Sequence, residues 1–137
     1  IAVMHPTHAL ANRDSLSIKD LSGFPMINFS PQANPITSDF NKQIFKKAGA
    51  QLNIVREIPN IETAAFCASI NEGVFIMPEY LLSSIGSLRT VPLTDSFAYV
   101  TLNLIWKKKN PNISIPVFVD SFSTYIQNRN PNLAPAD

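Results

Sequence analysis

The chain has 137 residues, of which 45% are apolar and 15% are charged, a composition typical of one ordered domain with a buried core. Its net charge of +1 excludes a broad electrostatic attraction to nucleic acid or to an anionic membrane. No apolar run reaches the roughly 18 residues that a membrane-spanning helix needs. The one cysteine, Cys67, excludes an intrachain disulfide and a cysteine-based metal cluster.

The start of the chain indicates where such a protein would be found. The first ten residues, "IAVMHPTHAL", lack the basic start and long apolar middle of a signal peptide, and Ile1 stands where an initiator Met would be. We therefore expect a fragment or processed product, in a reducing and hence cytoplasmic compartment.

Short apolar runs alternate with helical patterns along the chain. Runs bounded by Gly, Pro or polar residues predict strands at Ile1–Met4, Pro25–Ser30, Gln51–Ile58, Val74–Met77, Leu88–Leu93 and Phe97–Trp106. Apolar spacings of three and four, with capping residues at the ends, predict helices within Ser17–Gly23, Asn34–Gly49, Asn60–Ile70, Pro78–Gly86 and Asn112–Asn128. This alternation predicts an α/β layer fold with a largely parallel sheet.

The stretch "INEGVFIMPEYLL" predicts a tight turn between a helix and a buried strand. Asn71 stands where a helix takes a left-handed residue, a conformation that Asn tolerates better than most residues, and Gly73 adds backbone freedom. The run "VFIM" is short and wholly apolar, as in a strand that is covered on both faces. Pro78 then opens the next helix.

Candidate catalytic and metal-binding residues are few. His5 and His8 form an H-x-x-H pair, but the proline between them disfavours the helix that would bring both to one metal ion, so we expect a loop role. Cys67 lies among small apolar residues without a charge to lower its pKa, as a core residue would. Nothing brings Glu57 and Glu62 together as an acid and a base. The sequence lacks GxSxG, GxGxxG and P-loop motifs, so we expect no metal, cofactor or active site.

Two helix N-termini follow strands, at Asn34–Ile36 and Asn60–Glu62. In a parallel α/β sheet both would lie at the carboxyl edge, where ligands usually bind. Free N–H groups there favour anions or carboxylates, each terminus contributing on the order of 0.3–1 kcal/mol. Ordinary helix caps use the same residues, and the pattern alone leaves both interpretations open.

Four segments in order resemble the motifs of LysR-type transcriptional regulators. The segment "HALANRDSLSIKDLSGFPMINF" is similar to H-P-L-A with S-L-x-D-L and P-F-I, and "FNKQIFKKAGAQLNIVREI" is similar to F-x-x-A-G before a strand. The segment "ASINEGVFIMPEYLL" is similar to V-A-A-G-x-G-I-x-x-L-P, and "LNLIWKKKNPNISIPVFVDSF" is similar to L-x-L-x-W-R with S-P-A and F-x-x-F. The matches run from about His5 to Ile126. Ala9 replaces the proline of the first motif, Asn71 replaces a glycine of the third, and Pro116 is shifted by one position.

The resemblance implies a fold similar to type 2 periplasmic binding proteins, with two α/β lobes and a cleft crossed by two strands. Residues 1–106 would form the second lobe with its crossing strands, near Ile1–Met4 and Tyr99–Trp106. Residues 107–128 would return to the first lobe and form its C-terminal helix, with a tail at 129–137. The remainder of the first lobe and the winged helix-turn-helix that binds promoter DNA would be absent.

The resemblance also implies a share of the effector site. The ligand-binding residues would be Ser30, Pro31, Gln32, Ala33, Asn34, Ile61, Glu62, Thr63 and Phe97, with Phe29 also near the cleft. The helix from Ile36 to Ala48 would contact the other lobe of a second subunit in a dimer or tetramer, through Ile36, Phe40 and Ile44. The alternative for these three residues is that they pack on the sheet of their own subunit.

The implied function is to bind a small effector, with a carboxylate group, and so to modulate how an oligomer holds promoter DNA. One rival is a periplasmic-type solute-binding module. A second is a small enzyme of the same two-lobed fold, such as a dehydratase, which would need an acid or base such as Glu62 in the cleft. A third is a chain that acts only in oligomerisation.

Overall fold

The structure, a computed structural model, describes residues 1–101, 103–107, 109 and 111–129. The chain divides into two compact units, Ile1–Thr101 and Leu102–Asp137, and each is described by itself. The first unit contains the strands and most of the helices, and the second contains one long helix.

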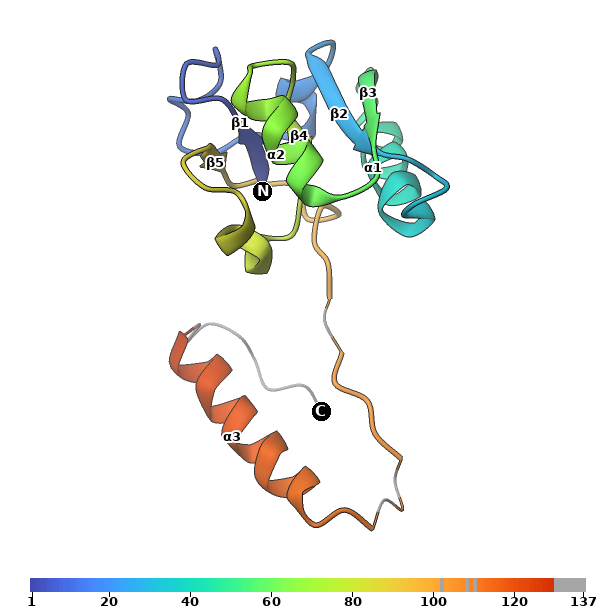
Figure 1. Cartoon of the computed structure of the whole chain (residues 1–137), viewed down its shortest axis with the longest axis vertical. Coiled ribbons are helices and arrows are strands. Elements are labelled where there is room, and N and C mark those ends of the chain that lie inside the picture. The colour runs from blue at the N-terminus through green and yellow to red at the C-terminus, as the bar shows by residue number, and fades with distance from the viewer. Residues whose placement is uncertain (102, 108, 110, 130–137) are drawn as a thin grey trace. The chain divides into compact units, whose positions relative to one another are not determined.

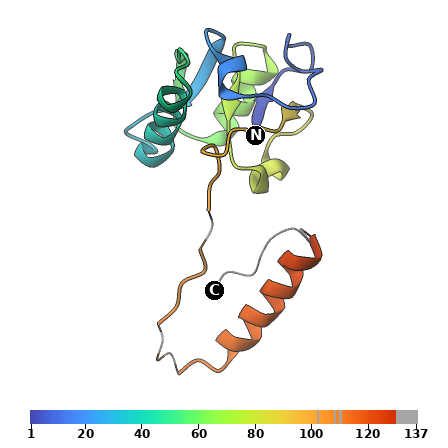
Figure 2. The same cartoon turned by 180° about the vertical axis from the view of Figure 1, so that it is seen from behind.

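The first unit alternates strands and helices in chain order (Figures 1 and 2). Its strands are β1 (Ala2–Met4), β2 (Pro25–Phe29), β3 (Asn53–Ile58), β4 (Phe75–Ile76) and β5 (Arg89–Val91). Its α-helices are α1 (Pro35–Ala48) and α2 (Ile61–Ser69), and its 3-10 helices are η1 (Ile18–Leu21) and η2 (Glu79–Ser84). The α/β fold class predicted from the sequence is confirmed.

The strands form one mixed layer in the order β3-β2-β4-β1-β5. β2 pairs with β3 in parallel, and β1 pairs with β4 and β5 in antiparallel fashion. A parallel bridge between Met26 and Val74 joins these two groups, with Ile27 N–H donating to the Val74 carbonyl at 2.8 Å. Four strands therefore share one direction, and β1 runs against both of its neighbours.

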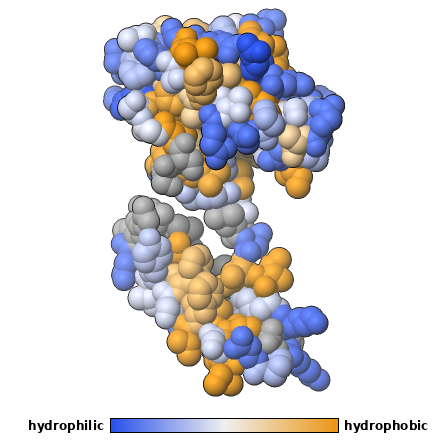
Figure 3. Space-filling model, in the orientation of Figure 1, coloured by the Kyte–Doolittle hydropathy of each residue, from blue (hydrophilic) through white to orange (hydrophobic). Residues whose placement is uncertain are grey.

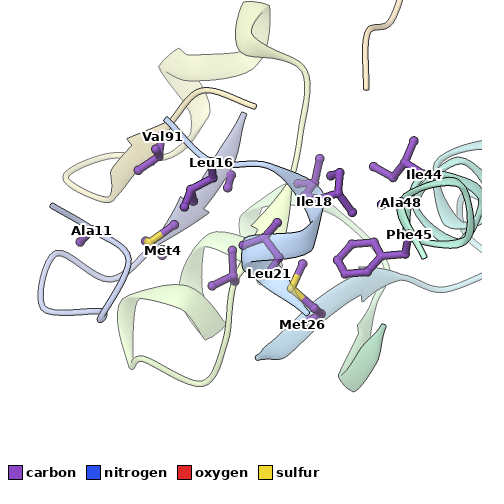
Figure 4. Close-up of a cluster of buried hydrophobic side chains, with 13 residues drawn as sticks. Met4, Ala11, Leu16, Ile18, Leu21, Met26, Ile44, Phe45, Ala48 and Val91 are labelled. Carbon is purple, nitrogen blue, oxygen red and sulfur yellow. The ribbon is translucent and has the colours of Figure 1, made fainter. Parts of the chain in front are cut away.

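Alternating side chains of the strands fill two apolar clusters on the two faces of this layer. Strand residues such as Met4, Met26 and Ile76 face the first cluster, which η1 and α1 cover. Figure 4 shows Ile44, Phe45 and Ala48 of α1 pointing toward Ile18, Leu21 and Met26. Their neighbours in the strands, Val3, Ile27 and Phe75, face the second cluster, which α2 and residues near η2 cover. The "VFIM" run is thus buried from both sides, as predicted.

Local capping signals explain where the helices begin and end. Asn34 caps α1 by accepting the Thr37 N–H at 3.0 Å, Pro35 occupies its first turn, and Gly49 ends it with a left-handed φ of 63°. Asn60 caps α2 in the same way. Asn71 has a φ of 59°, the left-handed conformation predicted for it.

Gly73 has a different role from the one predicted. Its φ does not lie in the left-handed region, so the backbone does not need the freedom of glycine. A Cβ at this position would lie 2.7 Å from the Pro25 carbonyl oxygen, closer than real Cβ contacts. Gly73 is required because the turn packs directly against the backbone of β2.

The strand predicted over Phe97–Trp106 is absent from residues 97–101 and 103–106, and Leu102 lies outside the described residues. A strand needs a neighbouring strand to satisfy its N–H and C=O groups, and none of the paired strands of the described chain lies along this segment. The prediction of a strand was therefore wrong for these residues, and the division of the chain into lobes stays a prediction. Apolar residues alternate along this segment of the sequence, but alternation alone does not supply a pairing partner.

The buried face of α1 is also rotated from the predicted one. Ile44 is 1% exposed, Phe40 is half-buried and Ile36 is 82% exposed, so these three residues do not share one environment. The buried residues of the helix are Ser38, Asn41, Ile44, Phe45 and Ala48. Two of them are polar, which an apolar pattern cannot anticipate.

The second unit contains α3 (Ser114–Arg129). Its apolar residues remain largely exposed, and Figure 3 shows apolar surface over this part of the chain. The exposed side chains include those of Val117, Phe118, Phe122 and Tyr125. Lys108 and the tail from residue 130 lie outside the described residues. Nowhere in the described ranges is a helix both long and apolar enough to cross a bilayer.

Candidate functional site

Two loops lie side by side at the carboxyl edge of β2 and β3. The last residues of the two strands, Phe29 and Ile58, are paired, and Ser30 N–H donates to the Ile58 carbonyl at 2.9 Å. The chain leaves this edge through residues 30–34 into α1 and through Pro59–Asn60 into α2. The two helix N-termini predicted to be neighbours are therefore brought together by a parallel β-α-β arrangement.

The loop from Ser30 to Asn34 is held by its own hydrogen bonds. The Ala33 and Asn34 N–H groups donate to the Ser30 carbonyl at 3.1 and 2.9 Å, and Ala33 N–H is also 3.2 Å from Ser30 Oγ. Ser30 Oγ is an acceptor here, so its own proton remains able to bond outward. Gln32 and Ala33 are exposed, and Ser30, Pro31 and Asn34 are half-buried.

The start of α2 uses more of its polar groups internally. Asn60 Oδ1 accepts both the Thr63 N–H at 2.9 Å and the Thr63 hydroxyl at 2.7 Å. The Thr63 proton is thus engaged in the helix cap, and its oxygen retains lone pairs that can accept. At α1, Asn34 Oδ1 accepts the Thr37 N–H at 3.0 Å.

An apolar residue adjoins each loop in the sequence, Phe29 before the first loop and Ile61 after the second. Phe29 and Ile61 are both half-buried against the second cluster, the one on the α2 face of the sheet. Phe97 instead packs against the first cluster, on the α1 face. The structure therefore places Phe29 and Ile61 on the same cluster and the contacts of Phe97 on the other.

Glu62 lines a groove on the outer side of α2. The groove has a volume of about 390 Å³, and its walls come from α2 and from the segment after η2, with Ala65, Phe66, Ser69, Ile85, Gly86, Ser87 and Leu88. This hollow was not predicted from the sequence. The feature that marks this groove in the structure is Phe66, an apolar side chain that is 64% exposed in the middle of a short helix.

The residues considered for metal or nucleophilic chemistry have structural roles. His5 Nδ1 accepts the Thr7 N–H at 3.1 Å, and His8 Nδ1 accepts the Leu10 N–H at 3.2 Å, so each ring stabilises a local turn. Burial, followed by the nearby Glu72 carboxylate, raises the pKa of the Cys67 thiol. In the part of the chain that the structure describes, no three His, Cys, Asp or Glu side chains are arranged to hold a metal ion.

One polar cluster escaped the sequence analysis. Asn28 of β2 contacts Ser38 and Asn41 of α1, the two elements that the Ser30–Asn34 loop connects, and all three side chains are buried. The available signal was an asparagine between Ile27 and Phe29 in a strand, since Asn is depleted in strands.

Comparison with known families identifies the relatives of this fold. The family model of the LysR substrate binding domain matches residues 1–125. The chain belongs to the LysR substrate-binding domain family. The family suggested by the four motifs is thereby confirmed, and with it a fold similar to periplasmic binding proteins. No curated protein sequence matches the chain significantly.

Solved structures of LysR effector-binding domains have the same fold. The benzoate complex of the BenM effector-binding domain has a TM-score of 0.77 at 18% identity and covers 98% of this chain and 61% of its own. The regulatory domain of Synechocystis PCC6803 CcmR, with 2-PG, has a TM-score of 0.65 at 15% identity and covers 93% and 62%. The QuiR effector-binding domain, with shikimate, has a TM-score of 0.58 at 21% identity and covers 69% and 44%. The chain thus spans less than two thirds of each of these relatives.

Proposed function

We propose that the chain is part of the effector-sensing domain of a LysR-type transcriptional regulator. It binds a small molecule with a carboxylate group at the carboxyl edge of β2 and β3. The observation that carries this proposal is the pairing of two helix-capping loops at that edge, with polar groups in both loops and the adjoining apolar residues Phe29 and Ile61 packed on one cluster. Ligand pockets combine these features, apolar walls with a few converging polar groups.

Three relatives of the same fold support the choice of ligand. Their structures hold benzoate, shikimate and 2-PG. All three are small organic acids, and N–H groups at helix N-termini favour negative charge. An organic acid is therefore the chemical class that this edge suits.

Each predicted ligand-binding residue has its own role in the proposal. Ser30 donates its free hydroxyl proton, and Gln32 and the Thr63 oxygen complete the polar contacts. Pro31, Ala33 and Asn34 shape the first loop, and Ile61 lies under the second. Glu62 and Phe97 are retained as outer members of the site, although Glu62 also lines the α2 groove and Phe97 packs on the core.

The proposal also assigns parts to the rest of the chain. Residues 1–106 form the second lobe and its connections, and residues 107–128 belong to the first lobe, whose surface would cover the apolar face of α3. Ile36, Phe40 and Ile44 mark the helix that faces a second subunit, with Ile36 as its exposed member. Promoter DNA is bound by another part of the complete regulator.

Ligand binding would act on DNA through the relative populations of two arrangements of the lobes. A ligand shifts such an equilibrium only by the difference between its affinities for the two arrangements. The coupling is reciprocal, so bound DNA changes the effector affinity by the same factor. The protein does no covalent chemistry in this proposal.

Calorimetric titration of the complete protein tests the proposal. Benzoate, shikimate and 2-PG are the probes, and benzamide, which has the shape of benzoate without its charge, is the matched control. We expect at least one acid to bind saturably and benzamide to bind at least about tenfold more weakly, because a hydrogen bond to a charged group contributes about 1.5–3 kcal/mol. Equal binding of benzoate and benzamide would refute recognition of the carboxylate.

A further inference from the structure

Three polar side chains are buried together beneath the start of α1. The exposed fractions of Asn28, Ser38 and Asn41 are 1%, 0% and 5%, and no other polar side chain is buried in the described part of the core. Asn41 Nδ2 donates to Asn28 Oδ1 at 2.8 Å, and Asn28 Nδ2 donates to Ser38 Oγ at 3.4 Å. We refer to these three residues as the polar triad.

The polar triad is a poor way to stabilise a core. Asn41 Oδ1 has no hydrogen-bond partner among the described residues. Turning both amides would reverse the donors and acceptors and would leave the Asn41 amide nitrogen unpaired instead, so the deficit does not depend on amide orientation. A partly satisfied buried network stabilises less than apolar side chains of the same shape. Stability alone does not explain the three residues.

The polar triad does fix the geometry of the candidate ligand loop. Asn28 lies two residues before Ser30, and Ser38 lies four residues after Asn34, with its N–H donating to the Asn34 carbonyl at 3.0 Å. The hydrogen bonds of the triad thus connect the strand that enters the loop to the helix turn that leaves it. Apolar packing is non-directional and permits sliding of a helix on a sheet, whereas hydrogen bonds constrain distance and angle.

We propose that Asn28, Ser38 and Asn41 are positioning residues for the effector site. They hold the first turn of α1 in register with β2, so that the Ser30 hydroxyl and the Ser30–Asn34 loop keep one arrangement. This inference rests on the proposed function, since it assigns a purpose to the loop. A buried polar group that provides specificity of arrangement at a cost in stability has precedents in other folds.

The test replaces the whole triad and compares local with global opening. The variant Asn28→Leu/Ser38→Ala/Asn41→Leu keeps the approximate shape and leaves no unpaired polar atom. The matched control is Phe45→Leu, on the same helix and also buried, which affects packing and keeps all three residues of the triad. Amide hydrogen exchange of the complete protein is followed by mass spectrometry in peptides from residues 29–38 and from β1 and β4.

We expect the triple variant to exchange at least about tenfold faster in residues 29–38, with wild-type rates in β1 and β4 and an unchanged or raised melting temperature. The control should lower the melting temperature and speed exchange throughout the sheet. Unchanged exchange in residues 29–38, or a uniform increase like that of the control, would overturn the positioning role. If the triple variant does not fold, Ser38→Ala alone removes one link without adding volume, and the same comparison applies.

Benzoate binding provides a second test of the positioning role. If the wild-type protein binds benzoate, the triple variant should bind at least about fivefold more weakly. Equal affinities would overturn the connection between the triad and the site. Failure of the wild-type protein to bind any of the three acids would refute the proposed function, while the exchange result would still decide the positioning role.

Discussion

Ser17 and Asp20 cap η1 reciprocally, and this pair shows how single side chains stabilise the first unit. Asp20 Oδ2 accepts the Ser17 hydroxyl and the Ser17 N–H, each at 2.7 Å, and Ser17 Oγ accepts the Asp20 N–H at 3.3 Å. Two hydrogen bonds from Ser17 lower the pKa of Asp20, the one from its hydroxyl more than the one from its N–H. The nearby charge of Arg13 lowers this pKa further. The ionised carboxylate is therefore the form that the folded state prefers.

The lowered pKa of Asp20 predicts a specific pH dependence. The unfolded state binds this proton more readily than the folded state, so the contribution of Asp20 to the free energy of unfolding is complete above the ordinary carboxyl pKa, about 4. It is lost as the pH falls through the lower folded-state pKa. We expect the melting temperature of Asp20→Asn to fall less than that of the wild type on acidification from about pH 5 to pH 2.

A thermal melt series at several pH values measures this difference. Asp14→Asn, at an exposed carboxylate in the same segment, is the matched control and should follow the wild-type curve. If the Asp20→Asn curve ran parallel to the wild-type curve at every pH, the charge of the Asp20 carboxylate would not contribute to stability through the hydrogen bonds with Ser17.

The turn between α2 and β4 connects two elements through backbone contacts. Val74 N–H donates to the Pro25 carbonyl at 2.9 Å, and a Cβ at Gly73 would lie 2.7 Å from the same carbonyl oxygen. Asn71 supplies the left-handed residue of this turn. Two neighbouring positions thus have different requirements, for small size at Gly73 and for a positive φ at Asn71.

Substitutions at these two positions should have opposite effects. Gly73→Ala forces the turn away from β2 and should lower the free energy of unfolding by about 1–3 kcal/mol, the usual cost of overpacking. Asn71→Gly removes the strain of a positive φ and should be neutral or slightly stabilising. Urea denaturation of the two variants measures both effects. A Gly73→Ala variant as stable as the wild type would mean that the close contact with Pro25 is not maintained.

The helix boundaries could be predicted because their signals are local. Asn34 with Pro35 and Gly49 encode the ends of α1, and Asn60 encodes the start of α2, through hydrogen bonds within three or four residues. Turn residues such as Asn71 could be predicted for the same reason, because their signals are also local. These features depend little on the rest of the molecule.

The sequence could not predict features that depend on distant partners. The segment at 97–106 has the alternation of a strand, but pairing requires another strand, which periodicity does not reveal. The face of α1 was misassigned because Asn28, in another element, makes Ser38 and Asn41 suitable for burial. In the candidate site, the proximity of the two loops was predictable from the parallel order, whereas the engagement of the Thr63 hydroxyl by Asn60 was not.

At the scale of the whole molecule, apolar side chains remain exposed on two helices of the first unit. Ile36 of α1 and Ile70, the residue after the end of α2, are 82% and 60% exposed. Our proposal places only the first of them in a contact between subunits. The two residues therefore form a matched pair, of the same type and similar exposure.

We expect Ile36→Ser to weaken self-association of the complete protein by about tenfold or more, because a buried isoleucine contributes about 1.5–3 kcal/mol. Ile70→Ser should leave the association constant within about twofold, as a surface substitution does. Sedimentation velocity over a range of concentrations measures both. Equal effects of the two substitutions would argue against an interface on α1.

The central claim is that the Ser30–Asn34 loop binds an organic acid, and the most direct measurement is the dissociation constant of Ser30→Ala for the best of the three acid probes. Ser69→Ala is the control, since Ser69 is an exposed serine of α2 whose hydroxyl already donates to the Phe66 carbonyl. Loss of a hydrogen bond to a charged ligand should weaken binding by Ser30→Ala about tenfold or more and leave Ser69→Ala unchanged. Wild-type affinity in Ser30→Ala, or the same loss in both variants, would contradict the assignment of the effector site to this loop.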